Sequence, residues 1–132
     1  MTFDHVGIVV ESIDGALPFY RDAMGLMVDH REEVSSQHVR VAFLKDPAAG
    51  RPQIELLEAI GQEGAVAKFL KSHGPGLHHV AFKTLDIEDS MRRFKAGGRP
   101  ALEATPRLGA RGHKVCFLHP KHAQGVLVEL VG

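Results

Sequence analysis

Two histidines and two glutamates recur at matching places in this 132-residue chain, and together these residue types suit a divalent-metal site. His5 and His79 are 74 residues apart, and so are Glu55 and Glu129. Each glutamate stands between aliphatic residues, where a carboxylate is costly to bury unless it is paired or bound to a metal. Two imidazoles and two carboxylates suit one ion of cobalt, zinc, nickel or manganese, with room for water or substrate. We therefore predict that these four residues share one divalent metal ion.

This prediction depends on the repetition of the four residues. A single strand histidine is more often a surface or satisfied core residue, and a single glutamate in an edge strand usually faces water. Side chains alternate between the two faces of a strand, so His78 and its counterpart Asp4 should point away from the metal. His78 is the alternative to His79 as a ligand.

The same 74-residue offset relates other parts of the two halves. Ser12-Ile13-Asp14 corresponds to Asp86-Ile87-Glu88, and Val41–Leu44 corresponds to Val115–Leu118. Alternating and helical hydrophobic spacing predicts one βαβββ module in each half. In the first half the strands are expected at residues 3–10, 26–30, 39–44 and 53–57, and in the second at 77–84, 99–102, 114–118 and 126–131.

One helix is expected after the first strand of each half. Ser12 or Asp14 can cap the first helix, which ends at Gly25, and Pro18 predicts a kink or a late start. Asp86 can cap the second helix, which ends at Gly97. Another short helix is expected at residues 63–73, between the halves.

A four-stranded sheet with one helix cannot cover both of its faces, but two such modules can pack side by side. We therefore expect an α+β fold whose eight strands form a partly open, barrel-like sheet. A single domain should span residues 1–132, with module 1 at 1–61, a linker helix at 62–73 and module 2 at 74–132.

Composition argues against several classes of partner. Sixteen basic residues balance sixteen acidic ones, which disfavours a nucleic-acid interface or an anionic membrane partner. No apolar run approaches the roughly 20 residues of a membrane span, and the first residues lack a secretion signal, so a cytoplasmic location is expected. Cys116 is the only cysteine, which excludes an intrachain disulfide and is typical of a buried core thiol.

A basic, glycine-containing segment near the end of the chain is a second candidate site. Its cations and backbone N–H groups could hold an anionic substrate group, and a solvated loop is the alternative. The candidate substrate-binding residues are Arg107, Arg111, Lys114 and Lys121. His30, His38 and His73 have no such support and are expected on the surface.

Several stretches resemble the vicinal oxygen chelate (glyoxalase/bleomycin resistance/dioxygenase) superfamily, and within it the methylmalonyl-CoA epimerases. They cover nearly the whole chain and are Phe3–Val10, Gln53–Glu58, Ala65–Leu70, Gly76–Phe82, and His119–Lys121 with Gly125–Leu130. The resemblance implies a glyoxalase-like fold and an acyl-CoA substrate. It also implies metal ligands at His5, His79 and Glu129, with a fourth at Glu55.

The activity that this resemblance implies is interconversion of (R)- and (S)-methylmalonyl-CoA, an isomerase reaction. An acidic α-proton is removed to form a metal-stabilised enolate, which is reprotonated on the other face. Glu129 and Glu55 are the candidate proton carriers. Two departures from the resemblance bear on this assignment: many bacterial epimerases have Gln at the Glu55 position, and Val41 stands where some have a catalytic Glu.

Two other functions are compatible with the sequence. A glyoxalase I-like lactoylglutathione lyase also uses a His, Glu, His, Glu metal set, which Glu55 fits well. A non-catalytic ligand-binding member of the superfamily is the second alternative, although such proteins generally lack the ligand set. We also expect a homodimer, since an open sheet leaves an edge that a partner can cover.

Overall fold

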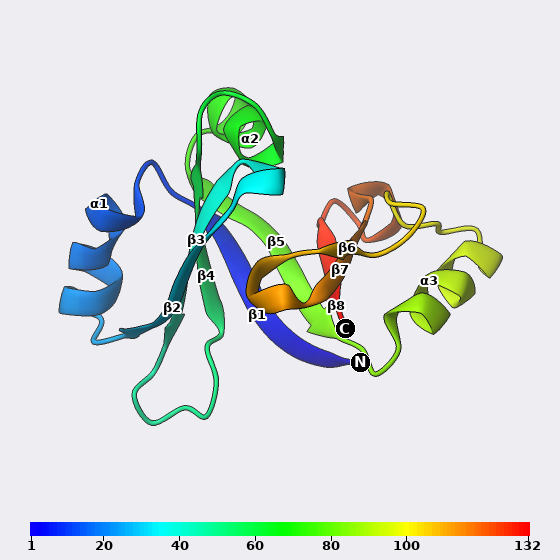
Figure 1. The fold of residues 1–132 in the computed structure, drawn as a ribbon, viewed down its shortest axis with the longest axis horizontal. Coiled ribbons are helices and arrows are strands. Elements are labelled where there is room, and N and C mark those ends of the chain that lie inside the picture. Colours follow the sequence, from blue (N-terminus) through cyan, green and yellow to red (C-terminus); the bar gives the residue numbers. More distant parts are fainter. The chain divides into compact units, whose positions relative to one another are not determined.

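The structure, a computed structural model, describes all 132 residues and divides into two compact units. The N-terminal unit is Val6–His78, and the C-terminal unit is Met1–His5 together with His79–Gly132. Strand β1 therefore begins in the C-terminal unit and continues into the N-terminal unit. Figure 1 shows that each unit holds its own set of strands with helices beside it.

The N-terminal unit has the strand order β2-β3-β4-β1, in which β1 and β4 run parallel and the other pairs antiparallel. One helix, α1, lies against a face of this sheet (Figure 1), where Ile13 and Leu17 pack on Leu44 and Leu56. The elements are β1 (Thr2–Val9), α1 (Ile13–Leu17), a π-helical segment (Pro18–Ala23), β2 (Met27–Val34), a 3₁₀ turn (Ser35–Gln37), β3 (Val39–Lys45), β4 (Ile54–Ala59) and α2 (Ala65–His73).

The C-terminal unit repeats this plan with the order β5-β8-β7-β6, in which β5 and β8 run parallel. Its helix α3 packs through Ile87 and Met91 on Cys116, Leu118 and Leu130. The elements are β5 (Gly76–Lys83), α3 (Ile87–Ala96), β6 (Arg107–Leu108), a 3₁₀ turn (Ala110–Gly112), β7 (Lys114–Leu118), a 3₁₀ turn (Pro120–His122) and β8 (Val128–Val131). Two βαβββ modules and the α+β fold class are thus confirmed.

The expected helix caps are present. Ser12 Oγ accepts a hydrogen bond from the Gly15 amide at 2.9 Å, and an Asp86 carboxylate oxygen accepts one from the Asp89 amide at 2.8 Å. The irregularity expected at Pro18 is also present, because α1 ends at Leu17 and a wider π-helical segment follows. Pro18 has no N–H to continue the α-helical pattern.

One predicted strand is wrong. Residues 99–102 form no strand, apart from an isolated bridge between Ala101 and Leu118, and the corresponding strand is β6, which begins at Arg107. Pro100 cannot donate a hydrogen bond, and the Phe117 amide of β7 donates to the Glu103 carboxylate at 2.8 Å rather than to a backbone carbonyl. A side chain therefore replaces the strand partner at this point.

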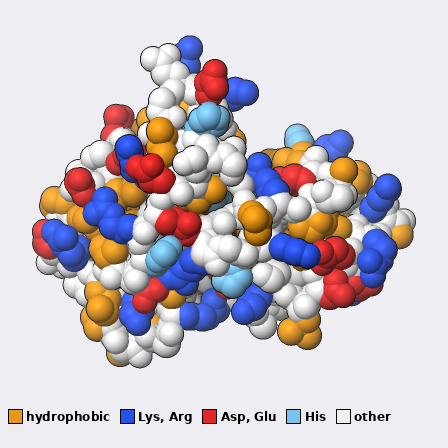
Figure 2. All heavy atoms as spheres, viewed as in Figure 1, with side chains coloured by type: hydrophobic (Ala, Val, Ile, Leu, Met, Phe, Trp, Pro, Cys, Tyr) orange, Lys and Arg blue, Asp and Glu red, His pale blue; other side chains and the backbone are white.

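Cys116 is fully buried under α3, as expected, and this burial raises the pKa of its thiol to about 12. None of the helices is both long enough and apolar enough to cross a bilayer. Lys and Arg side chains are interspersed with Asp and Glu over the face shown in Figure 2, in line with the balanced composition.

Candidate functional site

Three of the four predicted ligands meet in the C-terminal unit. His5 of β1, His79 of β5 and Glu129 of β8 are 3%, 5% and 7% exposed. The Nε2 atoms of the two histidines are 3.2 Å apart, and Glu129 Oε2 lies 3.4 Å from His5 Nε2 and 2.9 Å from His79 Nε2. Residues from three strands thus direct two nitrogens and one oxygen at a common point.

The chemistry of this cluster fits a divalent cation. Glu129 Oε2 is buried and has no hydrogen-bond partner in spite of its two imidazole neighbours. Burial alone would raise the pKa of Glu129, but the adjacent His5 and His79 hold it well below its ordinary value, so this carboxylate is ionised at neutral pH. A buried carboxylate oxygen that lacks a hydrogen bond, beside two imidazole nitrogens, is the donor set that a borderline metal ion satisfies.

Asp4 holds His5 in the orientation that a ligand requires. Its Oδ2 atom lies 2.7 Å from His5 Nδ1, which places the ring proton on Nδ1 and leaves the Nε2 lone pair for the cluster. Asp4 contacts Nδ1, whereas Nε2 faces His79 and Glu129, so Asp4 supports the ligand without joining the cluster.

The fourth predicted ligand, Glu55, lies in β4 of the N-terminal unit and is 6% exposed. Its register partners are Gly7 of β1 and Phe43 of β3. The adjacent Leu56 packs with the α1 cluster, so alternation places Glu55 on the face of the sheet away from α1.

His78 has a different environment from His79. Its ring makes an edge-to-face contact with Phe69 of α2, with the ring centroids 4.9 Å apart. His79 instead meets the edge of Phe117, at 5.7 Å between centroids. Strand alternation therefore separates the two adjacent histidines, as their order in the sequence suggested.

The four basic residues predicted to bind substrate have different surroundings. Arg107 lies over the Phe117 ring, 5.3 Å from its centroid, with its Nε 3.4 Å from Glu103. Lys114 is paired with Glu88 of α3, on the face opposite Phe117 and Glu129. Arg111 has a left-handed backbone with φ of 62°, and Lys121 is exposed in the turn Pro120–His122.

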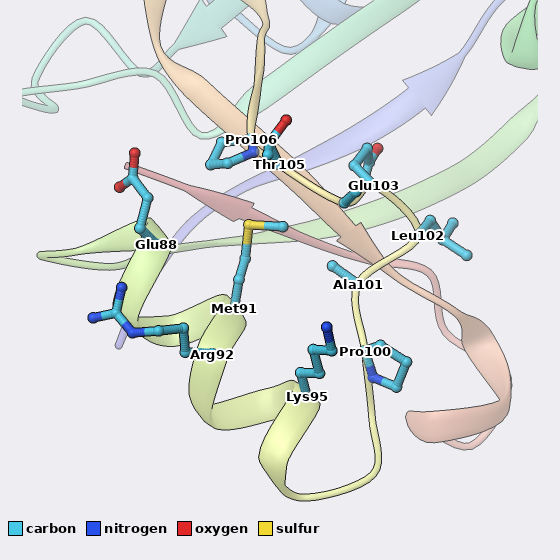
Figure 3. Close-up of a pocket in the computed structure, with 11 residues that line it drawn as sticks. Glu88, Met91, Arg92, Lys95, Pro100, Ala101, Leu102, Glu103, Thr105 and Pro106 are labelled. Carbon is cyan, nitrogen blue, oxygen red and sulfur yellow. The ribbon is translucent and has the colours of Figure 1, made fainter.

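A cavity of about 490 Å³ lies between α3 and the segment that follows it. Figure 3 shows Met91 and Lys95 of α3 across from Pro100 and Ala101. Met91 and Ala101 also pack against the core cluster beneath α3. Strand alternation directs Glu129 to the other face of the sheet, so this cavity is separate from the His5–His79–Glu129 cluster.

Comparison with known proteins agrees with the resemblance drawn from the sequence. Residues 4–117 match the Glyoxalase/Bleomycin resistance protein/Dioxygenase superfamily. The uncharacterized protein YqjC of Bacillus subtilis is 39% identical over 127 residues, covering 96% of this chain and 89% of that protein. The ethylmalonyl-CoA/methylmalonyl-CoA epimerase of Cereibacter sphaeroides is 36% identical over 129 residues, covering 96% of this chain and 94% of that protein.

Solved structures give the same result. A variant of the Streptomyces coelicolor methylmalonyl-CoA epimerase, in complex with 2-nitronate-propionyl-CoA, superposes with a TM-score of 0.91 at 38% sequence identity. The match covers 99% of this chain and 96% of that one. The chain therefore belongs to the glyoxalase/bleomycin resistance protein/dioxygenase superfamily and is a homologue of methylmalonyl-CoA epimerases.

Proposed function

We propose that this chain is a metal-dependent epimerase that interconverts (R)- and (S)-methylmalonyl-CoA. The observation that carries the proposal is the buried His5–His79–Glu129 cluster, whose carboxylate oxygen lacks a hydrogen bond, in a chain similar to such epimerases over nearly its whole length. The reaction requires a metal site that is shielded from water and has an ionised ligand. The three residues of the cluster are buried, and the Glu129 carboxylate is ionised.

We assign the metal to His5, His79 and Glu129, with Glu55 as the fourth ligand. Glu55 is buried at the repeat position of Glu129, and its register partner Gly7 follows His5 by two residues on the same strand. When bound, a divalent ion would supply Lewis-acid stabilisation of negative charge on the carboxylate and thioester oxygens of the substrate. Cobalt, zinc, nickel and manganese all suit this donor set.

The protein must also move two protons at the α-carbon. One group removes a proton from one face, and a second group delivers a proton to the opposite face. We assign Glu129 to one face, because its carboxylate is ionised and lies inside the cluster. Glu55 is the candidate that the repeat suggests for the other face, from the equivalent strand of the N-terminal unit.

The CoA moiety carries phosphate groups, which cations can hold. We propose Arg107, Arg111 and Lys121 for this role, as the sequence suggested. Arg107 supports it best, since its side chain is 43% exposed while its position is fixed between Phe117 and Glu103. Lys114 is a weaker candidate because Glu88 engages it on the other face of the sheet.

Separate assays of the two pure epimers test the proposal. In D₂O, wild-type protein loaded with metal should convert each epimer to the other and incorporate deuterium at the α-carbon, and a chelator should abolish both. Formation of lactoylglutathione from methylglyoxal and glutathione, without epimerisation, would instead support the glyoxalase I-like reaction. Tight binding of methylmalonyl-CoA with neither reaction would support the non-catalytic alternative.

A homodimer and a cytoplasmic location are part of the same proposal. The edge strands β2 and β6 are the surfaces that a second copy could cover. Light scattering coupled to gel filtration should then give twice the chain mass of 14.4 kDa, and a mass of one chain would contradict the dimer.

A further inference from the structure

Strand β2 presents an ionisable pair on the same face of the N-terminal unit as Glu55. His30 Nε2 lies 3.1 Å from Glu32 Oε1, and the two side chains are 40% and 29% exposed. The sequence gives neither residue a functional role, and it predicts that His30 lies on the surface. Both are instead half-buried.

A β-bulge at Asp29 turns this pair toward the Glu55 face. Val28 pairs with Leu44, but His30 pairs with Phe43, so the register shifts by one residue between them. Val28 packs with the core cluster beneath α1, and regular alternation would have directed His30 to that side as well. Bulges commonly occur next to active sites, where they redirect a side chain.

The strand register places the pair close to Glu55. Glu55, Phe43 and His30 stand side by side on three adjacent strands, β4, β3 and β2. Glu32 follows His30 by two residues along β2 and pairs with Val41 of β3. Neighbouring strands are about 5 Å apart, so the His30 and Glu32 backbones lie roughly 10 Å from β4. The Glu32 side chain spans part of that distance, toward a molecule bound beside Glu55.

The other charged residues of β2 are directed elsewhere. Arg31 reaches Asp14 of α1 at 3.2 Å, and Glu33 pairs with Arg40 at 2.7 Å. These contacts lie on the opposite face of the strand from Glu32, as alternation requires. At the start of β2, Asp29 is held 3.4 Å from Lys45. Glu32 is therefore the carboxylate of β2 that shares a face with Glu55 and is held by a histidine.

We propose that Glu32, held by His30, is the second proton carrier of the epimerase in place of Glu55, the candidate that the repeat suggests, and that Glu55 acts as a metal ligand only. This inference rests on the proposed function. In one direction the ionised Glu129 carboxylate takes the α-proton while the electrons of the C–H bond move onto the thioester carbonyl. A proton carried by Glu32 then forms the new C–H bond on the opposite face. The reverse direction retraces these steps, with Glu32 taking a proton and Glu129 returning the one that it took, so protons and charge balance.

The variant Glu32→Gln tests this role, with Glu33→Gln as a matched control on the opposite face. Epimerisation by Glu32→Gln should fall about 100-fold or more, the usual contribution of a general acid or base. One epimer should still exchange its α-proton for deuterium without inversion, because Glu129 serves that face alone. Metal content and melting temperature should stay at the wild-type values, and Glu33→Gln should keep wild-type activity.

Several results would overturn the inference. Epimerisation by Glu32→Gln at a rate close to that of the wild type would exclude Glu32 as a proton carrier. Loss of exchange from both epimers together with loss of metal would show that Glu32 only supports the fold of the site. A wild-type protein that neither epimerises nor exchanges would instead contradict the proposed function itself, before Glu32 is tested.

Discussion

Replacing Asp4 with alanine should weaken metal binding without touching a ligand. Asp4 holds His5 Nδ1 at 2.7 Å, a distance typical of a charge-assisted hydrogen bond. Loss of such a partner typically costs about 10- to 100-fold in metal affinity. Because the Asp4 side chain is 23% exposed and partly screened by water, we expect the lower part of that range. The predicted loss is about 10- to 30-fold, or about 1.4–2 kcal/mol.

The assay for this prediction is competition for Co²⁺ or Zn²⁺ against a chromophoric chelator, with three variants. Asp4→Asn retains an oxygen that can accept the Nδ1 hydrogen bond, so it should lose less affinity than Asp4→Ala. Asp14→Ala removes an exposed carboxylate that pairs with Arg31, and it should bind metal like the wild type. An Asp4→Ala protein that is folded and binds metal with wild-type affinity would refute the idea that Asp4 orients His5.

Three further predictions concern α3 and the core beneath it. The Cys116 thiol, whose pKa burial raises to about 12, should resist a disulfide reagent at pH 8 in native protein and react at once in denaturant; fast labelling of native protein would contradict its burial. Leu130→Ala empties a position that is 1% exposed, so the free energy of unfolding in urea should fall by about 2–5 kcal/mol, and a loss far below that would mean that the core there is loose. Asp86→Ala removes the cap of α3 and should cost about 1 kcal/mol by the same measurement, whereas no change would show that the Asp89 amide finds another acceptor.

The repeat made much of the fold predictable. One 74-residue offset fixed the equivalence of His5 with His79 and of Glu55 with Glu129, and the structure buries all four. Periodicity located the strands and helices because each module has one face under a helix, which gives regular hydrophobic spacing. The strand predicted at 99–102 was wrong because the Phe117 amide donates its hydrogen bond to the Glu103 side chain and not to a backbone carbonyl. No local sequence pattern reveals such a bond.

The supporting residues of the site were harder to predict. Alternation gave Asp4 no role in the site, because it does not show that a short carboxylate can contact the histidine next to it in the chain. The bulge at Asp29 reverses the phase of β2, so sequence periodicity alone cannot show that His30 and Glu32 share a face with Glu55. Bulges depend on how two strands pair, which involves residues far apart in the chain.

Metal content of adjacent histidine variants is the most direct test of the central claim. Wild-type protein, stripped and reloaded with Co²⁺ or Zn²⁺, should hold one ion per chain by elemental analysis. His79→Ala should lose the ion, while His78→Ala, which removes the ring contact with Phe69, should keep it. Both variants should retain the wild-type circular dichroism spectrum. Full metal content in folded His79→Ala, or its loss from folded His78→Ala, would contradict the assignment of the site.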